Sequence, residues 1–203
     1  ILLKFLLLSH LNIFHLDLFF IFVDSRSYCP EFTPRMSTET PRISVVIPCR
    51  NEEKYIESCI LSIINSDYPK DQIEILVCDG LSTDNTTSIL ERLASSYPMI
   101  QYLVNDKQTT PYGLNRGITK STGDIVIILG AHSEIHTDFI KECVYKINIE
   151  SDIGCVGGVL DNVFEDSLSE SIALAMSSPF GVGSAHFRTG LKDGYVDTVA
   201  FGA

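Results

Sequence analysis

The sequence predicts an α/β protein in which a mostly parallel central sheet is flanked by helices. Short apolar runs rich in β-branched residues alternate with stretches whose apolar residues recur at helical spacing. Polar residues also gather directly after several apolar runs, which is typical of the carboxyl edge of a parallel sheet. Strands and helices that alternate in this way form βαβ units, and the strands of such units run parallel.

Five apolar runs are predicted to be strands. The first, ISVVIP, is apolar and β-branched along most of its length, as expected for a strand that is covered on both faces. The five predicted ranges are 43–48, 73–78, 100–104, 124–130 and 153–160.

Four segments between these strands are predicted to be helices. Within the first, the apolar residues from Tyr55 to Ile64 fall on one face. Asn51 stands directly before this helix and is expected to cap it, and Asp84 is expected to cap the second helix. The four predicted ranges are 52–64, 83–96, 111–121 and 136–149.

Residues 1–42 differ in character from the domain that we expect over residues 43–203. Residues 1–23 are apolar and long enough to cross a bilayer, although Asp17 would be costly inside a membrane span. The chain does not begin with Met, whereas Met36 precedes a polar stretch that leads into the first strong strand. We therefore expect translation to start at Met36 and the residues before it to contribute nothing to the fold. A membrane anchor is the alternative interpretation.

The charge and the cysteine pattern exclude several classes of function. The formal net charge of −11 argues against a nucleic-acid partner, which would require a basic face. The six cysteines are spread singly, and without a C-x-x-C pair neither a structural zinc site nor a dithiol redox motif is expected. Buried free thiols are expected instead, which fits a reducing compartment.

Polar side chains follow four of the predicted strands. Ligands of parallel α/β sheets bind beyond the carboxyl ends of the strands, so these segments are candidates for a binding site. The four segments are 48–53, 78–84, 105–115 and 130–136. The polar residues that they bring to this edge include Asp79, Asp84, Asn115, His132 and Glu134.

The common nucleotide-binding motifs do not occur at these positions. The fingerprint G-x-G-x-x-G and the Walker P-loop both need a glycine-rich turn after the first strand, where the sequence PCRNEE stands instead. His132 and His136 are four residues apart, but a zinc protease needs the order H-E-x-x-H. A dehydrogenase, a P-loop ATPase and a zinc protease are therefore disfavoured.

Several segments resemble one enzyme family when they are taken together in order. They are ISVVIPCRNEEKYIESCILSI, ILVCDGLSTDNT, LNRGI and STGDIVIILGAHS. This combination resembles the family-2 inverting glycosyltransferases, which have the GT-A fold, and the resemblance covers residues 43–203. The later segments SSPFGVGSAHFRTG and YVDTVAFGA resemble the branch that makes succinoglycan-type bacterial exopolysaccharide.

The resemblance implies a set of residues that bind a nucleotide-sugar. The loop after the first strand would wrap the base and the ribose, and Asp79 would accept a hydrogen bond from the imide N–H of uracil. Gly117 would let the backbone approach the diphosphate. The residues implied are Pro48, Arg50, Asn51, Glu52, Asp79, Asn115 and Gly117.

The stretch LGAHSE, residues 129–134, stands where the family carries an Asp-x-Asp motif. The last carboxylate of that motif holds Mg²⁺ or Mn²⁺ against the two phosphates of the donor. Here His132 takes that position and Gly130 replaces the first Asp. Imidazole suits Mn²⁺ better than Mg²⁺, and Glu134 is a candidate second ligand. The resemblance therefore implies an altered metal site.

The function implied by the resemblance is inverting transfer of a hexose from a UDP-sugar to a glycan or lipid-linked acceptor. Such an enzyme would work in the cytoplasm, in association with the inner face of the bacterial plasma membrane. The family places its catalytic base after the position of Ala203, so we expect a C-terminally truncated fragment.

Two alternatives to this function stay open. A nucleotidyltransferase shares the sheet and the acid–metal chemistry, but it would normally show a glycine-rich loop with Lys or Arg after the first strand. A degenerate module that binds a UDP-sugar without turnover is the second alternative, and Gly130 supports it.

Overall fold

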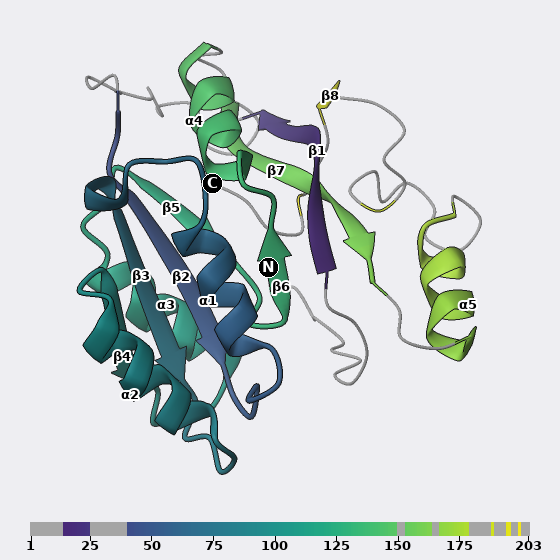
Figure 1. The fold of residues 1–203 in the computed structure, drawn as a ribbon. Helices are drawn as coiled ribbons and strands as arrows, with labels where there is room; N and C mark the ends of the chain where they lie inside the picture. The colour runs from purple at the N-terminus through teal and green to yellow at the C-terminus, as the bar shows by residue number, and fades with distance from the viewer. Residues whose placement is uncertain are drawn as a thin grey trace.

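The computed structural model describes residues 14–24, 40–149, 153–163, 167–178, 188, 194–195 and 199. Most of SSPFGVGSAHFRTG and YVDTVAFGA lies outside these residues. The elements in chain order are β1 (Phe14–Asp24), β2 (Ile43–Cys49), α1 (Ile56–Ile64), a 3₁₀ turn η2 (Lys70–Gln72), β3 (Ile73–Asp79), α2 (Thr86–Ser96), β4 (Ile100–Val104), α3 (Thr110–Lys120), β5 (Ile125–Ile128), β6 (Ser133–Ile135), α4 (Phe139–Ile149), β7 (Ile153–Asn162), α5 (Ser167–Met176) and β8 (Gly194–Tyr195) (Figure 1).

The central sheet has the strand order β4-β3-β2-β5, and all its neighbouring strands are parallel. Val45 of β2, for example, pairs with Ile75 on one side and with Ile127 on the other. Helices α1 and α2 cover one face of this sheet and α3 covers the other (Figure 1). The predicted fold class is therefore confirmed.

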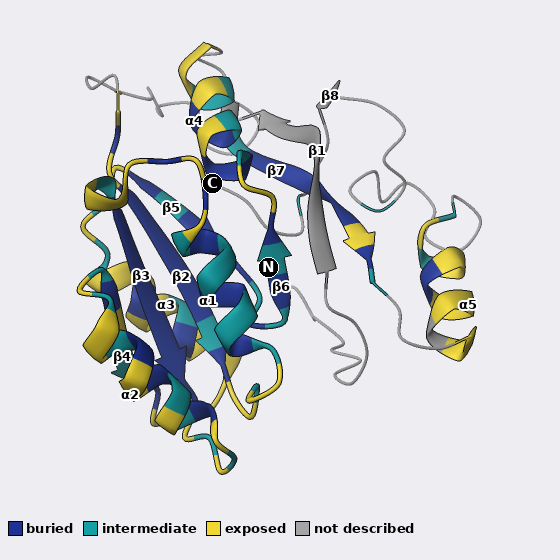
Figure 2. Cartoon of the chain, in the orientation of Figure 1, coloured by how far each residue is buried: buried dark blue, intermediate teal, exposed yellow. Residues whose placement is uncertain are grey.

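The apolar pattern of the sequence explains how these layers pack. Every residue of β3 is buried, as expected for a strand between two helical layers (Figure 2). Helix α1 buries Ile56, Cys59, Ile60 and Ile63, which recur at the spacing of one helical face. The five described cysteines are all free; those at positions 49, 59, 78 and 143 are buried, as predicted, and Cys155 is partly buried.

Helix α3 lies unusually close to the sheet because it carries two buried glycines. A Cβ atom added at Gly117 would lie 2.3 Å from Cγ1 of Val46 in β2 and 3.2 Å from Sγ of Cys78 in β3. Position 117 therefore needs glycine for helix–sheet packing. The small size of Gly117 thus serves the contact with β2, and its approach to a diphosphate stays a prediction.

The amino-terminal edge of the sheet is held by a buried carboxylate, Glu74, which is 2% exposed. It accepts hydrogen bonds from the hydroxyl of Ser44 (2.5 Å) and from the backbone N–H of Thr122 (2.5 Å), and Arg42 lies 3.6 Å away. Burial by itself would raise the pKa of Glu74, but these hydrogen bonds and the Arg42 charge lower it. The acidic side chain is thus a fixed part of the sheet at the end opposite to the candidate site.

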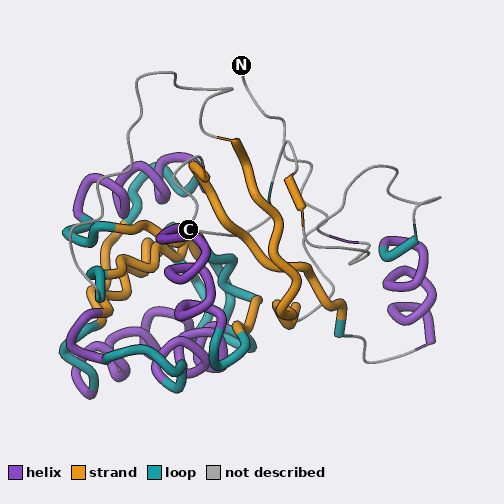
Figure 3. Tube along the Cα trace, turned by 90° about the horizontal axis from the view of Figure 1, so that it is seen from above, coloured by secondary structure: helices purple, strands orange, loops and turns teal. Residues whose placement is uncertain are grey.

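A second sheet lies beside the first, with β1 between β6 and β7 (Figures 1 and 3). Strand β1 runs parallel to β6 and antiparallel to β7. The structure differs here from the expectation that the residues before Met36 lie outside the fold, because Phe14–Asp24 supplies the central strand. Within the described part of the chain, no helix is long and apolar enough to cross a membrane.

The close packing of α3 predicts a larger loss of stability at Gly117 than at Gly113. Gly117→Ala should lower the free energy of unfolding by about 1–3 kcal/mol, because the added methyl group overlaps Val46. Gly113→Ala is the matched control, since a Cβ atom there would meet its nearest neighbour, Nδ2 of Asn105, at 3.2 Å. The control should change stability by less than about 1 kcal/mol, because alanine also favours the helix. Urea unfolding measures both values, and equal stabilities of the two variants would contradict this account.

Candidate functional site

The loops that follow β2, β3 and β5 meet at the carboxyl edge of the central sheet, because the three strands are parallel neighbours (Figure 1). Backbone and side-chain hydrogen bonds join the first two loops. The N–H of Asn51 donates to Oγ of Ser82 (2.8 Å), and the N–H of Thr83 donates to Oδ1 of Asn51 (2.8 Å). Oε2 of Glu53 accepts from the backbone and side-chain N–H groups of Asn85, both at 2.9 Å. The two loops therefore form one interlocked unit.

Asp79, the last residue of β3, lies at the centre of this unit and is 1% exposed. Its carboxylate accepts from the hydroxyl of Ser82 (2.5 Å), the hydroxyl of Thr87 (3.3 Å) and the hydroxyl of Tyr102 (3.2 Å). The N–H of Ser82 donates to the same carboxylate at 3.2 Å. Burial, and then the Asp79 charge, raise the pKa of Tyr102, so its hydroxyl remains a donor. Asp79 is thus at the predicted edge, but its oxygens are directed to groups of the protein.

Asp84 stands one residue before Asn85, which occupies the N-cap position of the second helix. Oδ1 of Asp84 accepts from the backbone N–H of Thr86, the first residue of α2, at 3.0 Å. Its Oδ2 accepts from the N–H of Glu53 at 3.2 Å. Burial would raise the pKa of Asp84, but the hydrogen bonds from Thr86 and Glu53 lower it. Asp84 therefore has a structural role that also ties α2 to the loop after β2.

Asn51 does not cap the first helix, which corrects a prediction. Helix α1 begins only at Ile56, and Tyr55 stands at its N-cap position. Asn51 instead has a left-handed backbone, with φ of 57°. Asparagine tolerates this conformation better than most residues. The residue therefore shapes the loop and holds the neighbouring loop through its amide.

Three other predicted residues of this loop lie at the same edge but differ in exposure. Pro48 is half-buried in β2, and Arg50 is exposed. Glu52 is half-buried, and its backbone N–H donates to Oγ1 of Thr86 (2.8 Å). The structure thus brings Arg50 and Glu52 together with Asn51 at the start of one loop.

His132 connects the LGAHSE loop to this unit. Its Nδ1 lies 3.5 Å from Oε1 of Glu52, and both side chains are partly exposed. Glu134, the predicted second ligand, is half-buried within β6. Across the described residues there is no group of three or more His, Cys, Asp or Glu side chains placed to hold a metal. The protein thus places the carboxylate of Glu52 beside the imidazole of His132 at the position of the altered motif, and a metal-binding role of Glu134 stays a prediction.

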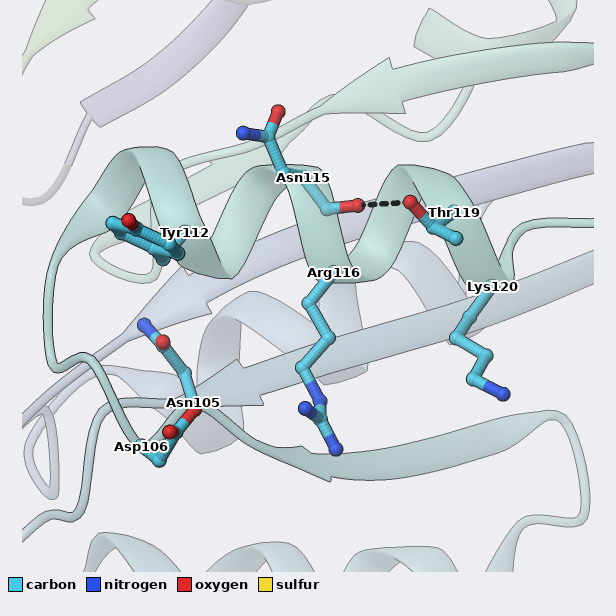
Figure 4. Close-up of a pocket in the computed structure, with 7 residues that line it drawn as sticks. All are labelled: Asn105, Asp106, Tyr112, Asn115, Arg116, Thr119 and Lys120. Carbon is cyan, nitrogen blue, oxygen red and sulfur yellow. Dashed lines mark hydrogen bonds between the residues drawn. The ribbon is translucent and has the colours of Figure 1, made fainter.

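Asn115 lies away from the interlocked loops. It is exposed on α3 and lines a groove of about 380 Å³ between this helix and the end of β4 (Figure 4). Its side chain and that of Arg116 point to different sides of the helix (Figure 4). Its backbone carbonyl accepts from the hydroxyl of Thr119 at 2.7 Å. The structure therefore does not bring Asn115 into the network that joins the first two loops.

If the catalytic base lay within this chain, the candidate carboxylates would be Asp161, Asp193 and Asp197. Asp161 is exposed in β7. Asp193 and Asp197 lie outside the described residues, so the structure places neither of them.

Sequence reasoning missed the three hydroxyl side chains that surround Asp79. Ser82 and Thr87 follow β3 in the segment STDNTT, and hydroxyl residues so close after a carboxylate are a usable signal. Tyr102 belongs to β4 and reaches Asp79 only through the pairing of β3 with β4. That contact depends on strand register, which the sequence alone does not provide.

Comparisons with known proteins agree with this architecture. The glycosyl transferase family 2 model matches residues 44–198. A glycosyltransferase of Methanococcus voltae, named dolichyl N-acetyl-alpha-D-glucosaminyl phosphate 3-beta-D-2,3-diacetamido-2,3-dideoxy-beta-D-glucuronosyltransferase, is 36% identical over 167 residues, which are 79% of this chain and 51% of that protein. Succinoglycan biosynthesis protein ExoA of Rhizobium meliloti is 29% identical over 148 residues, or 72% of this chain and 44% of that protein.

A solved structure is also similar. The mannosyltransferase PcManGT from Pyrobaculum calidifontis, in complex with GDP-Man and Mn²⁺, aligns with a TM-score of 0.51 and 31% identity over 54% of this chain and 33% of that chain. The chain spans about half the length of the curated relatives described above. The family match, the parallel sheet and the loops gathered at its carboxyl edge lead to one conclusion: this chain belongs to glycosyl transferase family 2.

Proposed function

We propose that this chain binds the nucleotide-sugar donor of an inverting transferase that moves a hexose from a UDP-sugar to a glycan or lipid-linked acceptor. The observation that carries the proposal is the interlocked pair of loops at the carboxyl edge, with His132 beside them. Pro48, Arg50, Asn51 and Glu52 would contact the nucleotide from the first loop. Such an edge is where α/β proteins bind nucleotides.

The charges of the site favour a divalent cation as cofactor. A bound diphosphate would lie near the carboxylate of Glu52 and near Glu134, which stands two residues after His132. The negative charge of the diphosphate therefore needs neutralisation. An imidazole 3.5 Å from a carboxylate is a donor set that suits Mn²⁺. His132 and Glu52 would hold the cation, and the donor's phosphate oxygens would complete its coordination. The cation would stabilise the negative charge on the departing diphosphate.

The reaction itself is a displacement at the anomeric carbon of the sugar. The acceptor oxygen forms a bond to that carbon as the bond to the diphosphate oxygen breaks, and UDP leaves with the electron pair. A base must remove the proton of the acceptor hydroxyl. The described residues at the sheet edge would act on the donor only, by binding its nucleoside and diphosphate.

The relatives support the acceptor class and the location that we propose. One relative is named for a dolichyl phosphate-linked substrate and another for succinoglycan biosynthesis. A lipid-linked acceptor resides at a membrane, so we place the whole enzyme at the cytoplasmic face of the plasma membrane. PcManGT was solved with GDP-Man, so the choice of uridine over guanosine in this chain is part of the proposal.

One prediction of the proposed function concerns the cation. UDP affinity should increase more with Mn²⁺ than with Mg²⁺, and His132→Ala should weaken the Mn²⁺-dependent binding about tenfold or more. Calorimetric titration of the 203-residue chain with UDP, in each metal and in EDTA, measures this effect.

His136→Ala is the matched control, because His136 is exposed in the segment between β6 and α4 and contacts Asp138. The control should bind UDP as the unchanged protein does. If His132→Ala kept the full Mn²⁺ effect, the cation would have to bind elsewhere, and a lack of UDP binding under all conditions would contradict the proposed function.

Another prediction of the proposed function distinguishes two roles of Asp79, organising the loop and recognising uracil. Because its carboxylate is buried among three hydroxyls, Asp79→Asn should lower the free energy of unfolding by about 1–3 kcal/mol. If Asp79 only organises the loop, the variant should lose affinity for UDP and CDP to the same extent. If Asp79 also accepts the imide N–H of uracil, which cytosine lacks, the loss should be confined to UDP.

Calorimetry with both nucleotides distinguishes these results, and Asp106→Asn is the control. Asp106 lies in the loop after β4 and pairs with the neighbouring Lys107 at the surface. From the geometry we expect equal losses for UDP and CDP. An unchanged stability of Asp79→Asn would refute the organising role.

A further inference from the structure

Among the described residues, three other than glycine have left-handed backbones, and each follows a successive strand of the central sheet. Asn51, Leu81 and Gln108 have φ angles of 57°, 58° and 59°, in the loops after β2, β3 and β4. Asparagine adopts this conformation readily, but a bulky apolar residue does so only under strain. Leu81 is therefore the strained member of this set.

The strain at Leu81 is maintained by hydrogen bonds on both sides of it. On one side, the N–H of Gly80 donates to the carbonyl of Cys49 (2.8 Å). On the other, Ser82 donates its hydroxyl to Asp79 (2.5 Å) and accepts from the N–H of Asn51 (2.8 Å). A residue held in this way keeps an unfavourable conformation because its neighbours determine it.

The side chain of Leu81 is also 43% exposed. Other large apolar side chains that are exposed lie on helices or at the end of β4. Among the described residues of the loops after β2 to β5, Leu81 is the one exposed side chain of this kind. Leu81 thus combines a left-handed backbone, which is unfavourable for a bulky residue, with an exposed apolar side chain in a loop. Such departures from local preference concentrate at functional sites.

We infer that Leu81 provides an apolar contact surface for the nucleoside of the donor, an inference that rests on the proposed function. A Cβ atom at Gly80 would lie 3.4 Å from Cβ and Cδ of Arg50, so the stem of Arg50 runs beside the same loop. The stem of Arg50 therefore lies beside Gly80, the residue that precedes Leu81. An apolar contact with the flat face of a base does not read hydrogen-bonding groups, so it serves uracil, cytosine and guanine alike.

The test replaces Leu81 with Gly and with Met and measures binding and stability in the full 203-residue chain. Leu81→Gly should not lower the melting temperature, because glycine adopts the left-handed backbone without strain. It should weaken UDP and CDP binding by about five- to tenfold, as expected for loss of a partial leucine contact, and leave Mn²⁺–pyrophosphate binding unchanged. Leu81→Met should stay within about twofold of the unchanged chain, because methionine restores an apolar side chain.

Gln108→Gly is the matched control, since it relieves the same backbone conformation in the next loop. It should leave nucleotide affinity unchanged. Unchanged UDP affinity in Leu81→Gly, with normal binding by the unmodified chain, would overturn the inference and leave the proposed function standing. Weaker pyrophosphate binding in that variant would also overturn it, because the loop itself would then have changed. A failure of the unmodified chain to bind any nucleotide would overturn both.

Discussion

The carboxylate of Asp79 is the constraint on which the rest of the candidate site depends. A buried charge is costly unless donors surround it, and the three hydroxyls that meet Asp79 come from different elements. Ser82 belongs to the loop after β3, Thr87 to α2 and Tyr102 to β4. Satisfying one carboxylate therefore fixes the loop, the start of a helix and the edge strand relative to one another.

Strand β3 carries a buried carboxylate at each end, and the two have different consequences. Glu74 at the amino-terminal edge fixes the strand ends through Ser44 and Thr122. Asp79 at the carboxyl edge fixes a loop that contains a strained and exposed Leu81. A buried, hydrogen-bonded carboxylate thus fixes the strand ends at one edge of the sheet and the loop conformation at the other.

The alternation of apolar runs was sufficient to predict the central sheet and its helices, because burial on both faces leaves a clear pattern from β2 to α4. The strand Phe14–Asp24 was not predicted as part of the fold, since most of it belongs to the apolar run 1–23, which also fits a membrane span. The short strand β6 was missed because three residues carry too little pattern.

At the site, the sequence predicted which loops meet but not what each side chain does there. Asn51 was expected to cap a helix, and only the backbone conformation shows its actual role. Gly117 was expected near a ligand, and only the distance to Val46 shows that it serves packing. The partnership of His132 with Glu52 joins loops 80 positions apart, so it follows from the pairing of β2 with β5 rather than from any local motif.

Hydrogen–deuterium exchange with and without UDP and Mn²⁺ tests most directly whether the carboxyl edge of the sheet is the donor site. If this edge binds the donor, UDP with Mn²⁺ should slow exchange in the loops 50–53, 79–83 and 130–134 together, because one nucleoside diphosphate would contact all three. Slower exchange confined to the groove lined by Asn115, Arg116 and Lys120, with the three loops unchanged, would contradict donor binding at this edge.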